Sequence, residues 1–143
     1  MIIADTGFWI ALANRRDEFH HRAKAWLEKI DEPLVTTWPV MAETCHLLLH
    51  RLGPESQWRF VESCSQGACD LFQLERSVIP KVAALMRQYA DLPMDLADAS
   101  LVLLAEHLGH GRILSTDQRD FRTYRWKQHE PFRNLLLEEP VVG

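Results

Sequence analysis

Two aspartates follow short apolar segments near the two ends of the chain. Asp5 comes directly after the apolar residues 2–4, and Asp117 closely follows the segment 112–115. Both segments have the length and apolar character of buried strands, and open α/β sheets bind ligands beyond the carboxyl ends of their strands. A carboxylate buried there is unfavourable unless it is paired, protonated or bound to a cation. We therefore expect Asp5 and Asp117 to line a common site.

Further acids fall on two predicted helices. One helix begins at Pro39, a residue well suited to a first helical turn, and Glu43 lies on or beside its apolar stripe. The other helix lies in the segment 92–109, where Asp95 and Asp98 are three residues apart and share a face. Asp95 is interpreted mainly as the N-cap of that helix. The small residues after Asp98 allow close backbone approach and indicate an acid that faces a cleft.

Strands and helices are predicted to alternate along the chain. The expected strands are 2–4, 34–37, 69–74, 112–115 and 132–137, and the expected helices are 8–13, 20–30, 39–52, 54–66, 77–90 and 92–109. This alternation predicts an α/β fold, with a mostly parallel central sheet of about five strands between two layers of helices. A length of 143 residues fits a single domain spanning 1–143.

The four acids Asp5, Glu43, Asp98 and Asp117 are thus predicted to converge at one edge of the sheet. Four carboxylates in one cleft repel one another and favour protonation unless divalent cations are bound. Ligands that are all oxygen suit Mg²⁺ or Mn²⁺ better than zinc. The pattern therefore indicates a site for Mg²⁺ or Mn²⁺.

The composition is typical of a folded, soluble protein. Hydrophobic residues make up 47% of the chain and charged residues 25%. No segment approaches the roughly 20 apolar residues of a membrane span, and no basic leader precedes the first apolar run. A net charge of −4 argues against an extensive nucleic-acid-coating surface, but acids around a cation do not exclude a nuclease. We expect a cytoplasmic protein that does not contact membranes.

The cysteines suggest no covalent framework. Cys45, Cys64 and Cys69 are odd in number and form no CxxC pair, so neither a disulfide framework nor a zinc knuckle is expected. Cys64 and Cys69 are spaced for a turn and are predicted to pack as apolar side chains.

The segments around the acids resemble the acidic motifs of PIN-domain ribonucleases, and within them VapC-type toxins of bacterial and archaeal toxin–antitoxin modules. The matching segments, in order along essentially the whole chain, are IIADTGFWIAL, PVMAETCHLL, DLADASLVLLAEHLG and ILSTDQRDF. The resemblance implies a PIN-like three-layer sandwich. It also implies that the metal-binding and catalytic acids are Asp5, Glu43, Asp98 and Asp117, with accessory roles for Thr6, Asp95, Thr116 and Asp120. Either Asp117 or Asp120 could lie nearer the metal.

This resemblance implies a metal-dependent endoribonuclease that hydrolyses RNA phosphodiester bonds with Mg²⁺, or with Mn²⁺ in its place. It also implies a small antitoxin partner and a homodimer. Positively charged side chains near the motifs are candidates for contacts with the RNA backbone, or equally for solvated surface charges; they are Arg15, Arg16, Arg119 and Arg122. Trp9, so close in sequence to Asp5, is a candidate to line the cleft.

Other functions remain open from the sequence. The same fold can serve as a nuclease-silent module that binds RNA or protein, or as a housekeeping RNA-processing nuclease without an antitoxin. The Asp5-Thr6-Gly7 triplet also matches aspartic proteases, but those are β-rich, whereas this chain alternates helix and strand. The presence of all four acids favours an active nuclease, because a protein that had lost nuclease activity would more often lack one of them.

Overall fold

The structure, a computed structural model, describes residues 1–138. A five-stranded sheet in the order β3-β2-β1-β4-β7 runs through its centre, and every pairing in it is parallel. The strands are β1 (Ile2–Ala4), β2 (Leu34–Thr37), β3 (Asp70–Phe72), β4 (Arg112–Leu114) and β7 (Arg133–Asn134). The carboxyl ends of neighbouring strands consequently lie along one edge of the sheet.

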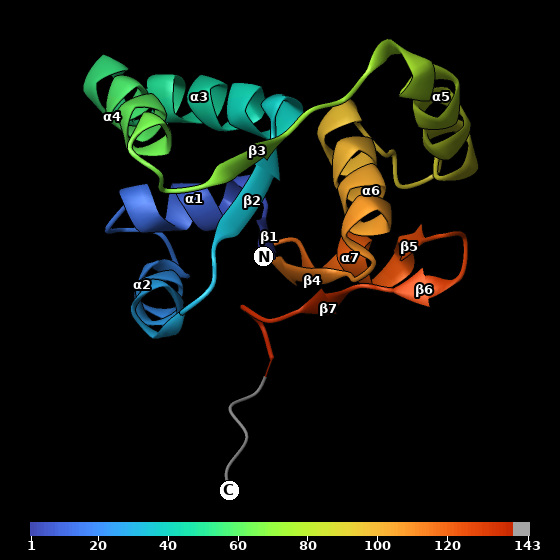
Figure 1. The fold of residues 1–143 in the computed structure, drawn as a ribbon. Coiled ribbons are helices and arrows are strands. Elements are labelled where there is room, and N and C mark those ends of the chain that lie inside the picture. Colours follow the sequence, from blue (N-terminus) through green and yellow to red (C-terminus); the bar gives the residue numbers. More distant parts are fainter. Residues whose placement is uncertain (139–143) are drawn as a thin grey trace, which may run out of the picture.

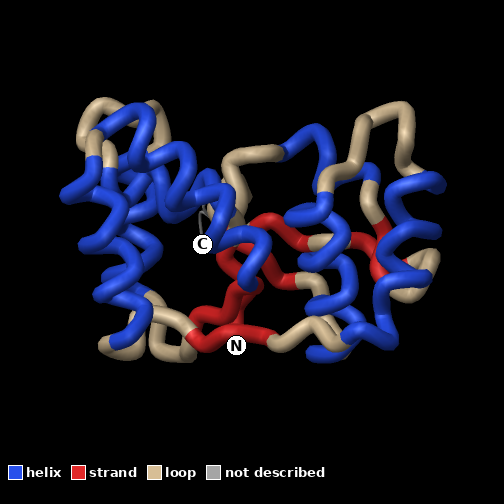
Figure 2. The backbone as a smooth tube through the Cα atoms, turned by 90° about the horizontal axis from the view of Figure 1, so that it is seen from above, coloured by secondary structure: helices blue, strands red, loops and turns tan. Residues whose placement is uncertain are grey.

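Helices cover both faces of the sheet, so the predicted three-layer α/β/α fold is confirmed. α1 to α4 gather on one side and α5 to α7 on the other (Figure 1), and from above the strands lie between these two groups (Figure 2). The helices are α1 (Thr6–Ala13), α2 (His20–Lys29), α3 (Trp38–Leu52), α4 (Pro54–Ser65), the 3₁₀ turn η1 (Arg76–Val78), α5 (Ile79–Gln88), α6 (Leu96–Leu108) and α7 (Gln118–Thr123). In the described part of the chain, no helix has the length and apolar character to cross a membrane.

The core is built around β1, the middle strand. All three residues of β1 are buried, and Ile3 pairs with Val35 of β2 on one side and with Ile113 of β4 on the other. A parallel strand covered on both faces needs apolar side chains at every position rather than at alternate ones. The short apolar run that opens the sequence meets this requirement.

Three acids cap the helices that start at the carboxyl edge of the sheet. Asp5 caps α1, Asp95 caps α6 and Asp117 caps α7, each by accepting a backbone N–H, at 2.7, 2.8 and 3.1 Å respectively. The capping role of Asp95 is as predicted. Because Asp5 itself is the cap, α1 begins at Thr6, two residues before the predicted start.

The last third of the chain departs from the predicted elements. The strand expected at 132–137 is present only as the two residues of β7, although Leu135 and Leu136 are buried as an apolar run requires. The antiparallel pair β5 (Arg125–Trp126) and β6 (Glu130–Pro131) was not predicted, nor was α7. These elements are too short for a repeated apolar pattern. The turn between β5 and β6 has positive φ at residues 127 and 128, but it lacks the Gly or Asn that usually marks such a turn in a sequence.

Candidate active site

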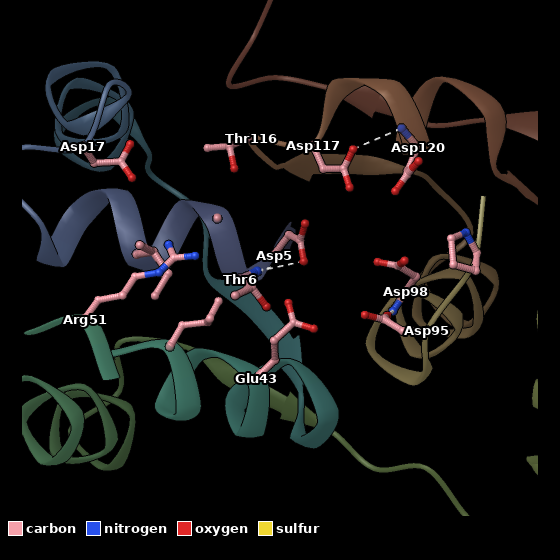
Figure 3. Close-up of a pocket in the computed structure, with 14 residues that line it drawn as sticks. Asp5, Thr6, Asp17, Glu43, Arg51, Asp95, Asp98, Thr116, Asp117 and Asp120 are labelled. Atoms are coloured by element: carbon pink, nitrogen blue, oxygen red, sulfur yellow. Dashed lines mark hydrogen bonds between the residues drawn. The ribbon is translucent and has the colours of Figure 1, made fainter. Parts of the chain in front are cut away.

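An open cleft of about 340 Å³ lies at the carboxyl edge of the sheet and has a strongly acidic lining (Figure 3). Its walls come from α1, α3, the start of α6 and the segment after β4. The structure brings all four predicted principal acids into this cleft, together with three further acids. The seven are Asp5, Asp17, Glu43, Asp95, Asp98, Asp117 and Asp120.

Asp5 is the most deeply placed of these carboxylates. It is only 7% exposed, and its two oxygens accept hydrogen bonds from the Thr6 N–H at 2.7 Å and the Ser115 hydroxyl at 2.8 Å. Burial, with smaller contributions from the charges of Glu43 and Asp117, raises the pKa of Asp5 from 3.8 to about 7, against the two hydrogen bonds. In the absence of a cation, Asp5 is therefore partly protonated near neutral pH.

Ser115 links the acids at the ends of β1 and β4. Its hydroxyl donates to Asp5 and accepts the backbone N–H of Asp117 at 2.9 Å. Its own backbone is held by Asn134, whose amide accepts the Ser115 N–H at 3.2 Å and donates to its carbonyl at 2.9 Å. Sequence reasoning chose the neighbouring Thr116 as the supporting hydroxyl and missed both Ser115 and Asn134. The pairing of residue 4 with residue 114 places Asp5 beside Ser115, and no local pattern in the sequence reveals that pairing.

Asp98 projects into the cleft from the first turn of α6 and points toward Asp5 (Figure 3). The Tyr124 hydroxyl donates to its carboxylate at 2.9 Å. Burial, followed by the charge of Asp95, raises the pKa of Asp98 to about 8. Tyr124 is fully buried and was not singled out from the sequence, where it reads only as a core aromatic.

The helices that carry Glu43 and Asp98 are tied together next to the cleft. The hydroxyls of Thr37, at the start of α3, and Ser100, on α6, share a buried hydrogen bond of 2.6 Å. Glu43 therefore faces the cleft from a fixed helix. Burial raises the pKa of Glu43, with further contributions from the charges of Asp95 and Asp117.

Asp117 and Asp120 lie side by side at the start of α7, and both line the cleft. The carboxylate of Asp117 accepts the Asp120 N–H at 3.1 Å. Burial, followed by a hydrogen bond with Asp117, raises the pKa of Asp120 to about 6. The two acids thus share one wall of the cleft.

The two accessory threonines are in the cleft wall as well. The hydroxyl of Thr6 is buried in the cleft wall, close enough to Glu43 to lower the pKa of that carboxyl against the effect of burial. Thr116 lies against Gly7 of α1 so closely that a Cβ at position 7 would be 1.9 Å from the Thr116 Oγ1. The glycine therefore lets the first turn of α1 approach the segment that carries Asp117.

Gly7→Ala is expected to lower the free energy of unfolding by about 1–3 kcal/mol, because the new methyl group overlaps Thr116. A decrease in stability is informative, because alanine in a helix ordinarily stabilises a protein relative to glycine. Urea denaturation of the wild type, Gly7→Ala and Gly7→Ala/Thr116→Ala measures the effect, and the double variant should recover part of the loss. A gain in stability for Gly7→Ala would contradict the close approach.

The positive charge in the cleft comes from a residue that sequence reasoning did not select. Arg51 of α3 is among the 14 residues that line the cleft, whereas the four predicted arginines, Arg15, Arg16, Arg119 and Arg122, are exposed outside that set. The spacing in the sequence could have identified Arg51. Glu43, Leu47 and Arg51 are each four residues apart, so all three lie on one face of α3. Trp9 is buried against Phe60 and likewise does not line the acidic cleft.

The cleft is suited to a hydrated divalent cation. In residues 1–138, no three His, Cys, Asp or Glu side chains already meet closely enough to enclose a metal ion on their own. Mg²⁺, however, keeps several of its waters and is commonly held by only one or two carboxylates. The donor atoms are carboxylate oxygens, and burial, with a smaller contribution from the charges of neighbouring acids, raises the pKa values of Asp5 and Asp98. The residues present therefore fit such an ion.

Comparison with known proteins agrees with this geometry. Ribonuclease VapC26 of Mycobacterium tuberculosis (strain ATCC 25618 / H37Rv) is 26% identical over 124 residues, which cover 87% of this chain and 92% of that relative. The crystal structure of VapC20, described as a Sarcin-Ricin loop cleaving toxin from Mycobacterium tuberculosis, superposes with a TM-score of 0.77 at 19% identity. That match covers 83% of this chain and 92% of the other, and it shows a shared fold. The family model of the PIN domain matches residues 2–127, nearly the whole described chain, and the protein therefore belongs to the PIN domain family.

Proposed function

We propose that this protein is a metal-dependent endoribonuclease and acts as the toxin of a type II, VapBC-like toxin–antitoxin module. The observation that carries the proposal is the pair of carboxylates, Asp5 and Asp98, that point toward one another across the cleft of a PIN domain. The relative VapC26 is a ribonuclease by name, and VapC20 is described as a Sarcin-Ricin loop cleaving toxin. Both support an RNA substrate for this chain.

Asp5 and Asp98 are the central ligands that we assign to Mg²⁺ or Mn²⁺, with Glu43 and Asp117 beside them. When bound, such an ion lowers the pKa of a coordinated water and offsets negative charge on the scissile phosphate. The chain holds these ligands in place through fixed donors. The Thr6 N–H and the Ser115 hydroxyl orient Asp5, and the Tyr124 hydroxyl donates a hydrogen bond to Asp98.

The remaining groups in the cleft have roles in handling the proton and binding the RNA. One of the cleft carboxylates takes the proton from the attacking water. Arg51 is the cationic residue in a lining that includes seven acids, and a guanidinium binds phosphate oxygens through paired N–H donors. We assign Arg51 to the RNA backbone near the scissile bond.

The nuclease proposal is tested by incubating the purified protein with structured and single-stranded RNA in the presence of Mg²⁺, Mn²⁺ or EDTA. Internal cleavage is expected with either metal and none with EDTA, because four carboxylates repel an RNA phosphate unless a cation lies between them. Gel analysis of end-labelled RNA separates internal cleavage from trimming at the ends. A folded protein that cleaves none of these RNAs with either metal would favour a nuclease-silent binding module.

The proposal also includes a small antitoxin partner and a homodimer, both based on the likeness to VapC proteins, and a cytoplasmic location, which the composition of the chain favours. We expect a small protein encoded beside this gene to co-purify with the chain and to suppress its RNA cleavage. Light scattering of the isolated protein measures the mass of the assembly. An active nuclease that its gene neighbour neither binds nor inhibits would instead be an RNA-processing enzyme without an antitoxin.

A further inference from the structure

Two cysteines outside the acidic cleft lie in direct contact. Cys64 is in the last turn of α4 and Cys69 precedes β3, and their sulfur atoms are 3.5 Å apart. The turn between them is closed by the Gly67 N–H, which donates to the Cys64 carbonyl at 3.2 Å, and by a second backbone hydrogen bond from Ala68 to Ser63 at 2.9 Å. The two thiols were predicted to pack as apolar groups. They do so, but they also face each other.

The two thiols differ in accessibility and in proton affinity. Cys64 is partly exposed, whereas Cys69 is only 7% exposed. The Cys69 S–H donates to the Cys64 sulfur, which lowers the pKa of Cys64 and raises the pKa of Cys69. Cys64 is therefore the thiol that solvent reaches and that more readily forms the nucleophilic thiolate, and Cys69 is a protonated thiol held against it.

We propose that Cys64 and Cys69 form an oxidation site in which hydrogen peroxide converts the two thiols into a reversible disulfide. The Cys64 thiolate attacks the peroxide, its S–O bond forms as the O–O bond breaks, and hydroxide leaves and becomes water on protonation. The Cys69 sulfur then attacks the resulting sulfenic acid, the S–S bond forms, and a second water carries away the oxygen and the Cys69 proton. The two thiols lose two electrons, which the peroxide gains. A dithiol such as dithiothreitol reverses the change by exchange.

The backbone between Cys64 and Cys69 is suited to the small approach of the two sulfur atoms that a disulfide bond requires. A disulfide holds its sulfurs at about 2.05 Å, so the two atoms must approach from their present 3.5 Å. Residues 65–68, which join the two cysteines, are all exposed, and the turn that they form is held by backbone hydrogen bonds rather than by buried side chains. Cys45, the remaining thiol, lies on α3. The hydrogen bond from Cys69 identifies that residue, and not Cys45, as the partner of Cys64.

The site is tested on the reduced full-length protein by exposure to hydrogen peroxide, alkylation of the remaining thiols, and mass spectrometry of a tryptic digest. No Lys or Arg lies between Arg59 and Arg76, so one peptide, 60–76, contains both Cys64 and Cys69, and Cys45 falls in the peptide 30–51. We expect peptide 60–76 to lose the mass of two hydrogen atoms and to carry no alkyl group, while peptide 30–51 is alkylated. Dithiothreitol should restore two alkylation sites in 60–76.

Two variants separate the roles of the thiols. Cys45→Ser should form the same modified peptide at the wild-type rate. Cys69→Ala should stop at the sulfenic acid, which dimedone traps on Cys64, with circular dichroism checking that the variant is folded. Full alkylation of peptide 60–76 after peroxide treatment of the wild type would overturn the proposal, as would a cross-link between peptides 30–51 and 60–76. Because none of these readouts uses RNA, the result is independent of the nuclease proposal.

Discussion

Asp98→Asn is expected to lower metal-dependent RNA cleavage by at least about 100-fold, the scale of losing one group that holds the ion or transfers a proton. Asparagine keeps the size of the side chain and can still accept the hydrogen bond from Tyr124, but it removes the negative charge that a cation needs. The measurement is the cleavage rate of end-labelled RNA with Mg²⁺ in excess, compared with the wild type under identical conditions.

The loss of activity should not come with a loss of stability. Burial disfavours the charged form of Asp98, as its pKa of about 8 shows, so a neutral amide should leave the melting temperature of the metal-free protein unchanged or higher. Asp91→Asn is the matched control, because Asp91 is exposed and lies outside the cleft lining. Cleavage at the wild-type rate by Asp98→Asn would mean that the site is elsewhere or that the preparation contains another nuclease.

The metal-free protein is expected to lose stability as the pH rises from about 4 to about 8. Asp5 and Asp98 have a pKa of 3.8 as free side chains and of about 7 and about 8 in the fold. Between these values the folded state binds more protons than the unfolded state, so raising the pH favours unfolding. For the fully buried Asp5, the loss of stability is on the order of 2–4 kcal/mol. Thermal denaturation in EDTA at pH 5, 6.5 and 8 measures it.

Asp5→Asn isolates the contribution of that carboxyl. The variant should show a flatter dependence on pH and should melt above the wild type at pH 8, because its buried side chain no longer ionises. Mg²⁺ should raise the melting temperature of the wild type more at pH 8 than at pH 5, since a cation binds the deprotonated carboxylates. Parallel curves for wild type and Asp5→Asn would show that Asp5 does not titrate in this range.

Much of the fold can be predicted from the sequence, because its main elements are encoded locally. The apolar run before Asp5 has the length and character of a buried strand and forms β1, and the start and stop signals around α6 place Asp95 at its cap. Elements that lack such signals were missed. These are α7, with six residues, and the two-residue strands β5 and β6. They are too short to show a repeating pattern of apolar residues, and their conformation depends on packing against the rest of the chain.

The sequence by itself placed Asp5, Asp98 and Asp117 at the carboxyl edge of the sheet, because a strand end or a helix start is a local property. It did not place Asp17, which lines the cleft from the segment between α1 and α2. Only the tertiary structure decided what holds and surrounds them. Ser115 and Asp5 are 110 residues apart and meet through the register of β1 against β4, and Tyr124 reaches Asp98 across 26 residues. Arg51 is in the cleft because α3 packs against α1 and α6. Strand register and helix packing arise from long-range contacts over the whole core, and no window of neighbouring residues contains that information.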